Sequence, residues 1–290
     1  MPVPDKDTLP LYGCMTGIVL PEPRVELAPG IALSQGYFQV FSTPILAFKE
    51  APPGQHTPAP WVPVRGDFNS YLSRVELAVT DTGALEGFSP SQALWLVAAL
   101  LRLRAESPVR VAAVANAPLA SLPDIKDPWA LAFEASGHQT GIFRTQYTEL
   151  TVADITWLAA ALPIAARLYH DERFMRAFTV FDESLWSGRI EVGAVLIWTA
   201  MEILFDLSGA QHKTKAICSA LSAHVAVDER DRDRAYNVIR ELYEKRGRVV
   251  HSGWSVQSYD YAQSFALARA AFVKVLDDAQ LPKSPKRALQ

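Results

Sequence analysis

In the second half of the chain, apolar residues recur every three or four positions, the spacing that places side chains on one face of an α-helix. Thr151, followed three residues later by Asp154, is a typical N-terminal cap for the first helix, and Ser187-Gly188 interrupts the pattern. The segments with this spacing are residues 155–169, 171–186, 189–207, 213–226, 228–250 and 258–279. Five or six helices joined by short turns predict an antiparallel helical bundle.

The first half has a different pattern, in which short runs of β-branched and aromatic residues alternate with proline and glycine. Ser89 and Pro90 precede an apolar segment, residues 92–104, that predicts one helix, because proline suits the first helical turn. Residues 51–63 contain five prolines and predict an exposed loop or an extended connector. The first half is therefore expected to be α+β, with strands at residues 12–20, 31–41, 75–80 and 109–115.

Proline divides the chain near residue 150. Of the 20 prolines, 17 lie in residues 1–150, and Pro163, Pro282 and Pro285 follow. Because helix interiors tolerate few prolines, this composition predicts two domains. We expect residues 1–150 to form an α+β domain of unknown role, a candidate sensor or regulator, and residues 151–290 to form the helical bundle.

The composition predicts a cytoplasmic chain with a sizeable core. Of the 290 residues, 49% are hydrophobic, and the first ten lack the basic and apolar regions of a secretory signal. The most apolar stretch, residues 190–207, contains Glu191, Glu202 and Asp206, so we interpret it as a buried helix and expect no membrane partner. The two cysteines are far apart in the sequence and indicate neither a disulfide framework nor a metal site. With a formal net charge of −3, any nucleic acid has to be held by a local basic patch.

One arginine lies where an apolar residue is expected. Arg246 follows Leu242 by four residues and falls on the apolar stripe of the helix that begins at Asp228. Burying an unpaired guanidinium costs on the order of several kcal/mol, so Arg246 either has a partner or extends its head to solvent. The stripe that should face the bundle comprises Ala235, Val238, Ile239, Leu242 and Val249.

A carboxylate is the second anomaly. Glu202 lies in an almost wholly apolar segment, residues 192–205, and needs a cationic partner if that helix is buried. The candidate partners are Arg246, Lys213 and Lys215. A structural ion pair would explain Glu202, and the same pair would also fix the orientation of a functional arginine.

His251 stands five residues after Arg246, before Ser252-Gly253, which predicts the end of the helix. Five residues turn an ideal helix so that the two side chains lie roughly 140° apart. Convergence on one ligand therefore requires Gly247 to relax the helix, long side chains that reach around it, or a second copy of the chain. A histidine at a helix end can also act simply as a cap that interacts with the helix dipole.

These residues carry a resemblance to a known superfamily. The string Leu242-Tyr243-Glu244-Lys245-Arg246-Gly247-Arg248-Val249-Val250-His251 resembles the Arg-x-x-x-x-His signature of HEPN domains, in particular the Apea-like branch. The upstream string Trp198-Thr199-Ala200-Met201-Glu202-Ile203-Leu204-Phe205 is similar to that branch's apolar helix with an embedded glutamate, and Lys213 begins the next helix. The resemblance covers roughly residues 170–280.

The resemblance implies a metal-independent endoribonuclease that uses no cofactor and acts as a homodimer on RNA. His251 would move a proton to or from the ribose 2′-OH and the leaving 5′-oxygen, and Arg246 would stabilise charge on the phosphoryl oxygens. Glu202, Tyr243 and Lys213 would support these two residues. Flanking phosphates would be held by Arg240, Lys245 and Arg248.

Two functional hypotheses follow from the resemblance. The first is a ribonuclease of the toxin or anti-phage type, with an antitoxin or a regulatory protein as a partner. The second is a non-catalytic HEPN module that binds RNA, a nucleotide or a protein. Gly247 favours the second, since many active members have a polar residue directly after the arginine.

Overall fold

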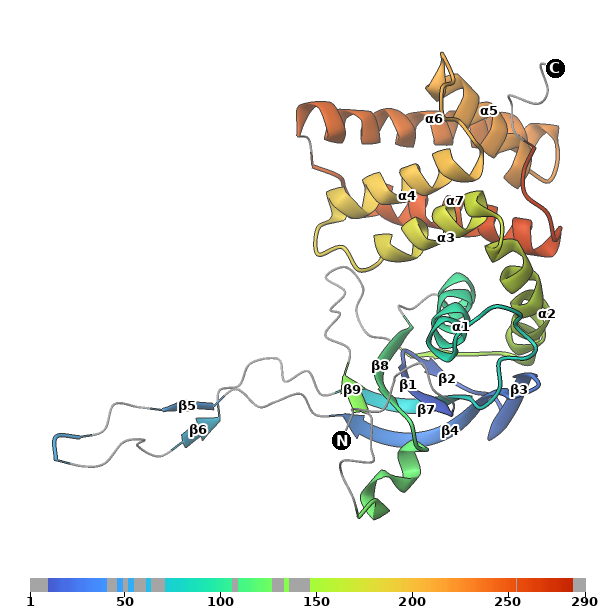
Figure 1. Cartoon of the computed structure of the whole chain (residues 1–290). Coiled ribbons are helices and arrows are strands. Elements are labelled where there is room, and N and C mark those ends of the chain that lie inside the picture. The colour runs from blue at the N-terminus through green and yellow to red at the C-terminus, as the bar shows by residue number, and fades with distance from the viewer. Residues whose placement is uncertain are drawn as a thin grey trace.

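The computed structural model describes residues 10–40, 46–48, 52–54, 61–63, 71–105, 109–126, 133–135, 147–253 and 255–283. Within these ranges an antiparallel sheet region precedes a helical region, as the sequence predicts at this level (Figure 1). Helices α1 and α2 lie between the sheet and the remaining helices, and α5 and α6 form the layer farthest from the sheet (Figure 1).

The main sheet has six antiparallel strands in the order β3-β4-β7-β1-β8-β9. The predicted strands in residues 12–20, 31–41, 75–80 and 109–115 are confirmed at their cores. Two short pairs accompany this sheet, β2 with β10 in parallel and β5 with β6 in antiparallel orientation. The strands are β1 (Leu11–Thr16), β2 (Ile18–Val19), β3 (Arg24–Ala28), β4 (Ile31–Val40), β5 (Leu46–Phe48), β6 (Trp61–Pro63), β7 (Tyr71–Val79), β8 (Arg110–Ala115), β9 (Phe133–Ala135) and β10 (Thr148–Glu149).

The prediction that residues 51–63 form a loop is wrong for residues 61–63. Trp61–Pro63 forms β6, which pairs with β5, although proline cannot donate a ladder hydrogen bond. Residues 52–54 form an exposed turn, and residues 51 and 55–60 lie outside the described residues.

Helix α1 (Pro90–Arg104) covers one face of the sheet. Its start is fixed by a capping box, in which the Ser89 hydroxyl accepts from the backbone N–H of Gln92 and the Gln92 side chain accepts from the backbone of Ser89. Leu94 packs so closely on Gly13 of β1 that a side chain at Gly13 would meet Leu94 at 2.9 Å. The absence of a side chain at Gly13 therefore lets helix and sheet approach.

Within the described ranges the helical region contains six helices, three of which begin at a side-chain cap. Thr151 and Asp154 form the expected capping box, and Asp171 and Asp228 cap α3 and α6 through their side chains. Gly253 has a φ of 66° and ends α6, as the sequence predicts. These helices are α2 (Val152–Tyr169), α3 (Glu172–Ser184), α4 (Ile190–Leu204), α5 (Lys213–Val225), α6 (Glu229–Ser252) and α7 (Ser258–Asp277).

Helix α6 lies at the edge of the helical region and buries a narrower stripe than expected. Ile239, Leu242 and Tyr243 are its buried residues, whereas the side chain of Val238 is exposed. The expectation for Val238 is wrong because α6 packs mainly on α5 and α4, which leaves its outer half in solvent.

One hydrophobic cluster continues across residue 150. Its buried members run from Leu11 in β1 through α1 to Leu276 in α7, so the sheet and helical regions share a core. A buried ion pair crosses the same boundary: Arg102 of α1 binds Asp182 of α3 through two hydrogen bonds of 2.6 and 2.8 Å, with 4% and 6% of the side chains exposed. Trp95 donates a third hydrogen bond to Asp182, at 3.0 Å.

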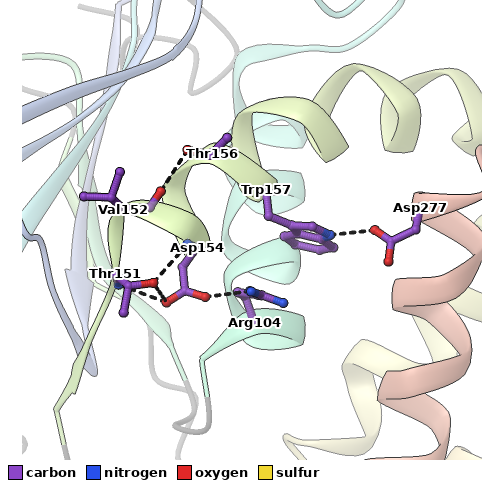
Figure 2. Close-up of polar contacts among 7 residues, drawn as sticks. All are labelled: Arg104, Thr151, Val152, Asp154, Thr156, Trp157 and Asp277. Carbon is purple, nitrogen blue, oxygen red and sulfur yellow. Dashed lines mark hydrogen bonds and ion pairs between the residues drawn. The ribbon is translucent and has the colours of Figure 1, made fainter.

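A second polar contact ties α1 to α2 and α7 (Figure 2). The Nε atom of Arg104 donates to Asp154 at 2.6 Å, and its guanidinium lies over the ring of Trp157 at 5.5 Å. The indole N–H of Trp157 in turn donates to Asp277 near the end of α7, at 2.8 Å. Desolvation by burial raises the pKa of Asp154, but the hydrogen bonds from Thr151 and the ion pair with Arg104 outweigh it and hold this pKa below its usual range.

Among the described residues, α2 is the one helix long and apolar enough to cross a membrane by length and composition. Its buried residues, which include Leu158, Leu162 and Ala165, pack in the shared core with α1, β3 and α3. The apolar content of α2 is therefore explained by core packing. Residues 190–204 form α4, whose buried face includes Ile197, Trp198 and Met201.

Candidate functional site

Glu202 of α4 and two residues of α6 meet where these helices cross. The hydroxyl of Tyr243 donates to Oε1 of Glu202 at 2.8 Å, and Nη2 of Arg246 lies 3.3 Å from the same oxygen. The ring of Tyr243 packs edge-on against buried Trp198, with centroids 5.2 Å apart, so the phenol is fixed from its apolar side. The sequence hypothesis that Arg246 is a partner of Glu202 is confirmed.

A second cation approaches the same carboxylate. Nζ of Lys213, the first residue of α5, lies 3.8 Å from Oε2 of Glu202. Glu202 thus faces a guanidinium, an ammonium and a phenol, and its side chain is only 17% exposed. This arrangement neutralises the buried charge and limits the positions that Arg246 can adopt.

Tyr243 is held in its protonated form. Burial, followed by the hydrogen bond to Glu202, raises the pKa of the Tyr243 phenol far above its ordinary value of 10. The guanidinium of Arg246 lies 5.6 Å from the centre of the same ring. Tyr243 is therefore both a hydrogen-bond donor to Glu202 and a surface on which Arg246 rests.

Arg246 retains hydrogen-bonding capacity. Its side chain is 18% exposed, and its Nε atom is buried without a hydrogen-bond partner among the described residues. An arginine has five N–H donors, and Glu202 occupies only part of them. Arg246 is thus held by Glu202 and can still donate hydrogen bonds to another group.

An open groove of about 1060 Å³ lies beside this contact, between the start of α5 and the C-terminal part of α6. Arg246, Gly247 and His251 line it from α6, and His212, Lys213 and Lys215 line it from α5. The other lining residues are Ala210, Gln211, Thr214, Tyr236, Tyr243 and Glu244.

Arg246 and His251 line the same groove without a break in the helix. Helix α6 continues through Gly247, so relaxation at this glycine, one of the three alternatives that the sequence left open, does not occur. On an ideal helix Gly247 falls about 100° from Arg246 and about 40° from His251, between the two side chains. A Cβ atom built at Gly247 meets nothing within 4 Å, which places open space there. The missing side chain leaves the middle of the groove free.

The groove is locally basic in an acidic chain. Two lysines, one arginine and two histidines line it, against the single carboxylate of Glu244, which itself lies 4.0 Å from Arg240. Such a patch attracts an anionic ligand where the chain as a whole, with a net charge of −3, does not.

The three residues expected to hold flanking phosphates lie outside the set that lines this groove. Lys245 binds two carboxylates, those of Glu241 and Asp260, each at 2.8 Å. Arg240 faces Glu244, and the side chain of Arg248 is exposed to solvent. Their phosphate-binding role stays a prediction, and Lys245 would have to leave two ion pairs to fulfil it.

Three lining residues had no assigned role in the groove from sequence alone. His212 and Tyr236 were not singled out, and Lys215 was considered only as a partner of Glu202. The string His212-Lys213-Thr214-Lys215 at a helix start is a signal for His212 and Lys215, because side chains that can carry positive charge are unfavourable at the positive end of a helix. No such signal marks Tyr236.

Within the ranges that the structure describes, no three His, Cys, Asp or Glu side chains cluster in a way that could hold a metal ion. Compared with protein-family models, with curated proteins and with solved structures, the chain gives no match. The functional argument therefore rests on the residues and their geometry.

Proposed function

We propose that the helical region is an antiparallel bundle of the HEPN type, close to the Apea-like branch, and that it is a metal-independent endoribonuclease. The proposal rests on one observation above all: Arg246, anchored by Glu202, and His251 line the same basic groove of a single chain. A guanidinium can stabilise charge on the phosphoryl oxygens and an exposed imidazole can transfer a proton, two of the tasks in RNA cleavage through the ribose 2′-OH.

Each side chain has a distinct task in this reaction. Arg246 donates hydrogen bonds to the phosphoryl oxygens as negative charge builds on them. His251 exchanges a proton with the 2′-OH or with the leaving 5′-oxygen, since imidazole changes charge near neutral pH. The products are a 2′,3′-cyclic phosphate and a 5′-OH, and a deoxyribose strand is refused because it lacks the nucleophile.

Glu202, Tyr243 and Lys213 position these groups. Glu202 pairs with Arg246, the ring of Tyr243 lies against its guanidinium, and Lys213 lines the groove while also facing Glu202. Lys213 and Lys215 are the cations best placed for phosphates adjoining the scissile one, because both line the groove.

The biological setting extends the same proposal. We place the protein in the cytoplasm as a toxin or anti-phage nuclease, controlled by an antitoxin or a regulatory partner. Residues 1–150 would then sense the trigger, and their shared core with the helices provides a route to the groove. A homodimer remains a prediction, although Arg246 and His251 already share one groove within a chain.

Labelled RNA distinguishes a nuclease from a protein that only binds. We expect the purified protein to cut RNA in the presence of EDTA, and His251→Ala to reduce the rate by about 10²–10⁴-fold, the usual contribution of a proton-transfer group. His170→Ala, which changes an exposed histidine outside the groove, is the matched control. Equal cleavage by the wild type and His251→Ala would refute the proposal.

A non-catalytic module that binds RNA, a nucleotide or a protein is the second candidate. The observation in its favour is that Arg246 is already engaged by Glu202 and is only 18% exposed, as expected for a structural ion pair. In that case His251→Ala changes no rate, whereas Lys213→Ala and Lys215→Ala weaken RNA retention in a gel-shift assay.

A further inference from the structure

A second imidazole lies in the same groove. His212 of the α5 start and His251 of the α6 end both line it, and both side chains are exposed. We propose that His212 is the second proton-transfer group of the cleavage reaction and acts as the base that activates the 2′-OH. This inference rests on the proposed ribonuclease function.

The local structure leaves the His212 ring available. His212 occupies the N-cap position of α5, but its side chain makes no capping hydrogen bond, unlike Thr151, Asp171 and Asp228 at the starts of their helices. A histidine that neither caps its helix nor packs in the core has no structural task there. Its neighbours in the groove, Lys213 and Arg246, are groups that bind phosphate.

The chemistry needs two proton-transfer groups. When the ribose O2′ attacks phosphorus, a P–O2′ bond forms and the P–O5′ bond breaks on the opposite side. The proton of the 2′-OH passes to one imidazole, and a second imidazolium gives its proton to O5′, so that both atoms and charges balance. A groove walled by His212 on one helix and His251 on the other supplies both groups from two directions.

The two imidazoles come from different elements. His251 lies in the last turn of α6, and His212 directly precedes Lys213, the first residue of α5. With His212 as the proposed base, His251 is the acid that protonates the leaving oxygen.

This assignment removes the need for a composite site. Arg246, His212 and His251 are all present in one groove of one chain, so a complete set of reacting groups does not depend on a second copy. Dimerisation would then affect stability or RNA capture rather than the chemical step.

Two substrates separate the two histidines. The first is an oligonucleotide with a single ribose, and the second is uridine 3′-(p-nitrophenyl phosphate), whose p-nitrophenolate leaves without being protonated. We expect His212→Ala to lose about 10²-fold or more on both substrates, because both need the 2′-OH to be activated. His251→Ala should lose a similar factor on the oligonucleotide but keep most of its activity on the p-nitrophenyl ester.

Thermal unfolding of each variant verifies that it folds, and His170→Ala serves as the control. If His212→Ala cuts the oligonucleotide at the wild-type rate while His251→Ala is inactive, the second-histidine inference fails and the ribonuclease proposal stands. If the wild type cuts neither substrate, the ribonuclease proposal fails and this inference fails with it. Loss of both activities in His212→Ala alone supports the assignment.

Discussion

Oε1 of Glu202 accepts a hydrogen bond from the hydroxyl of Tyr243 at 2.8 Å and forms an ion pair with Nη2 of Arg246 at 3.3 Å, so one oxygen atom contacts both residues of α6. The carboxylate lies on α4 and both partners lie on α6. The position of Arg246 is thus set by the helix crossing as well as by its own rotamer.

Glu202→Gln should lower RNA cleavage more than it lowers stability. The amide can still accept from Tyr243, but it no longer neutralises Arg246, whose guanidinium becomes less firmly held. Tyr243→Phe removes one hydrogen bond to a charged group and should cost about 1–2 kcal/mol of unfolding free energy. Urea titration and single-turnover RNA cleavage measure the two effects; unchanged cleavage in Glu202→Gln would show that the carboxylate does not position Arg246.

Substitutions of increasing size at Gly247 test whether RNA occupies the groove. Gly247→Ala should raise the unfolding free energy by up to about 1 kcal/mol, because glycine is a poor helix former and a Cβ atom has free space there. The activity should persist. Gly247→Leu should leave stability near that of the alanine variant but reduce cleavage, since the larger side chain fills the space between Arg246 and His251. A fully active Gly247→Leu variant would place RNA elsewhere.

Mixing two inactive variants tests whether the site lies in one chain. Arg246 and His251 line the same groove, so Arg246→Ala combined with His251→Ala should show no more cleavage than either variant alone. Recovery of activity on mixing would instead indicate a site shared between two copies. Light scattering of the mixture, run alongside, reports whether copies associate at all.

The buried ion pair between Arg102 and Asp182 predicts that the sheet region and the helical region unfold together. Asp182→Ala leaves the guanidinium of Arg102 buried beside Trp95 without its carboxylate, and should destabilise the protein by about 3–5 kcal/mol. Glu172→Ala, which removes an exposed i,i+4 pair with Arg176, should have little effect. Tryptophan fluorescence and far-UV circular dichroism should show one coincident transition in the wild type, and two separated transitions would contradict the shared core.

The lowered pKa of His224 predicts that the protein loses stability on mild acidification. Burial, more than the nearby Lys274, lowers the pKa of His224 below its ordinary value of 6.5, while the carbonyl of Ala271 and the carboxylate of Asp278 oppose the shift. The unfolded chain therefore binds the proton more tightly, and the contribution of His224 is present above about pH 6.5 and is lost as the pH falls through the pKa of the folded state. Urea midpoints between pH 7.5 and 5 should fall less steeply in His224→Gln than in the wild type.

Local signals in the sequence predicted much of this structure. The cap at Thr151 and the stop at Gly253 were predictable because each satisfies backbone groups within a few residues. The pairing of Glu202 with Arg246 was predictable because two charges in apolar segments each require a partner.

Features that depend on how distant elements pack were not predictable in this way. No periodicity reveals that the start of α5 lies against the end of α6, so His212 was missed and Val238 was assigned to the core. The pattern in residues 1–150 likewise did not indicate that Arg102 is buried against Asp182, since an arginine near a helix end normally reaches solvent.

The packing across residue 150 determines how this chain can be dissected. A fragment that begins at α2 would uncover the apolar flank on which α1 rests and would leave Asp182 without its guanidinium. Because α1 also packs on β1 and β7, a piece expected to carry an intact groove includes the sheet as well as α1. Truncation at the proline boundary would therefore yield a fragment with a damaged core.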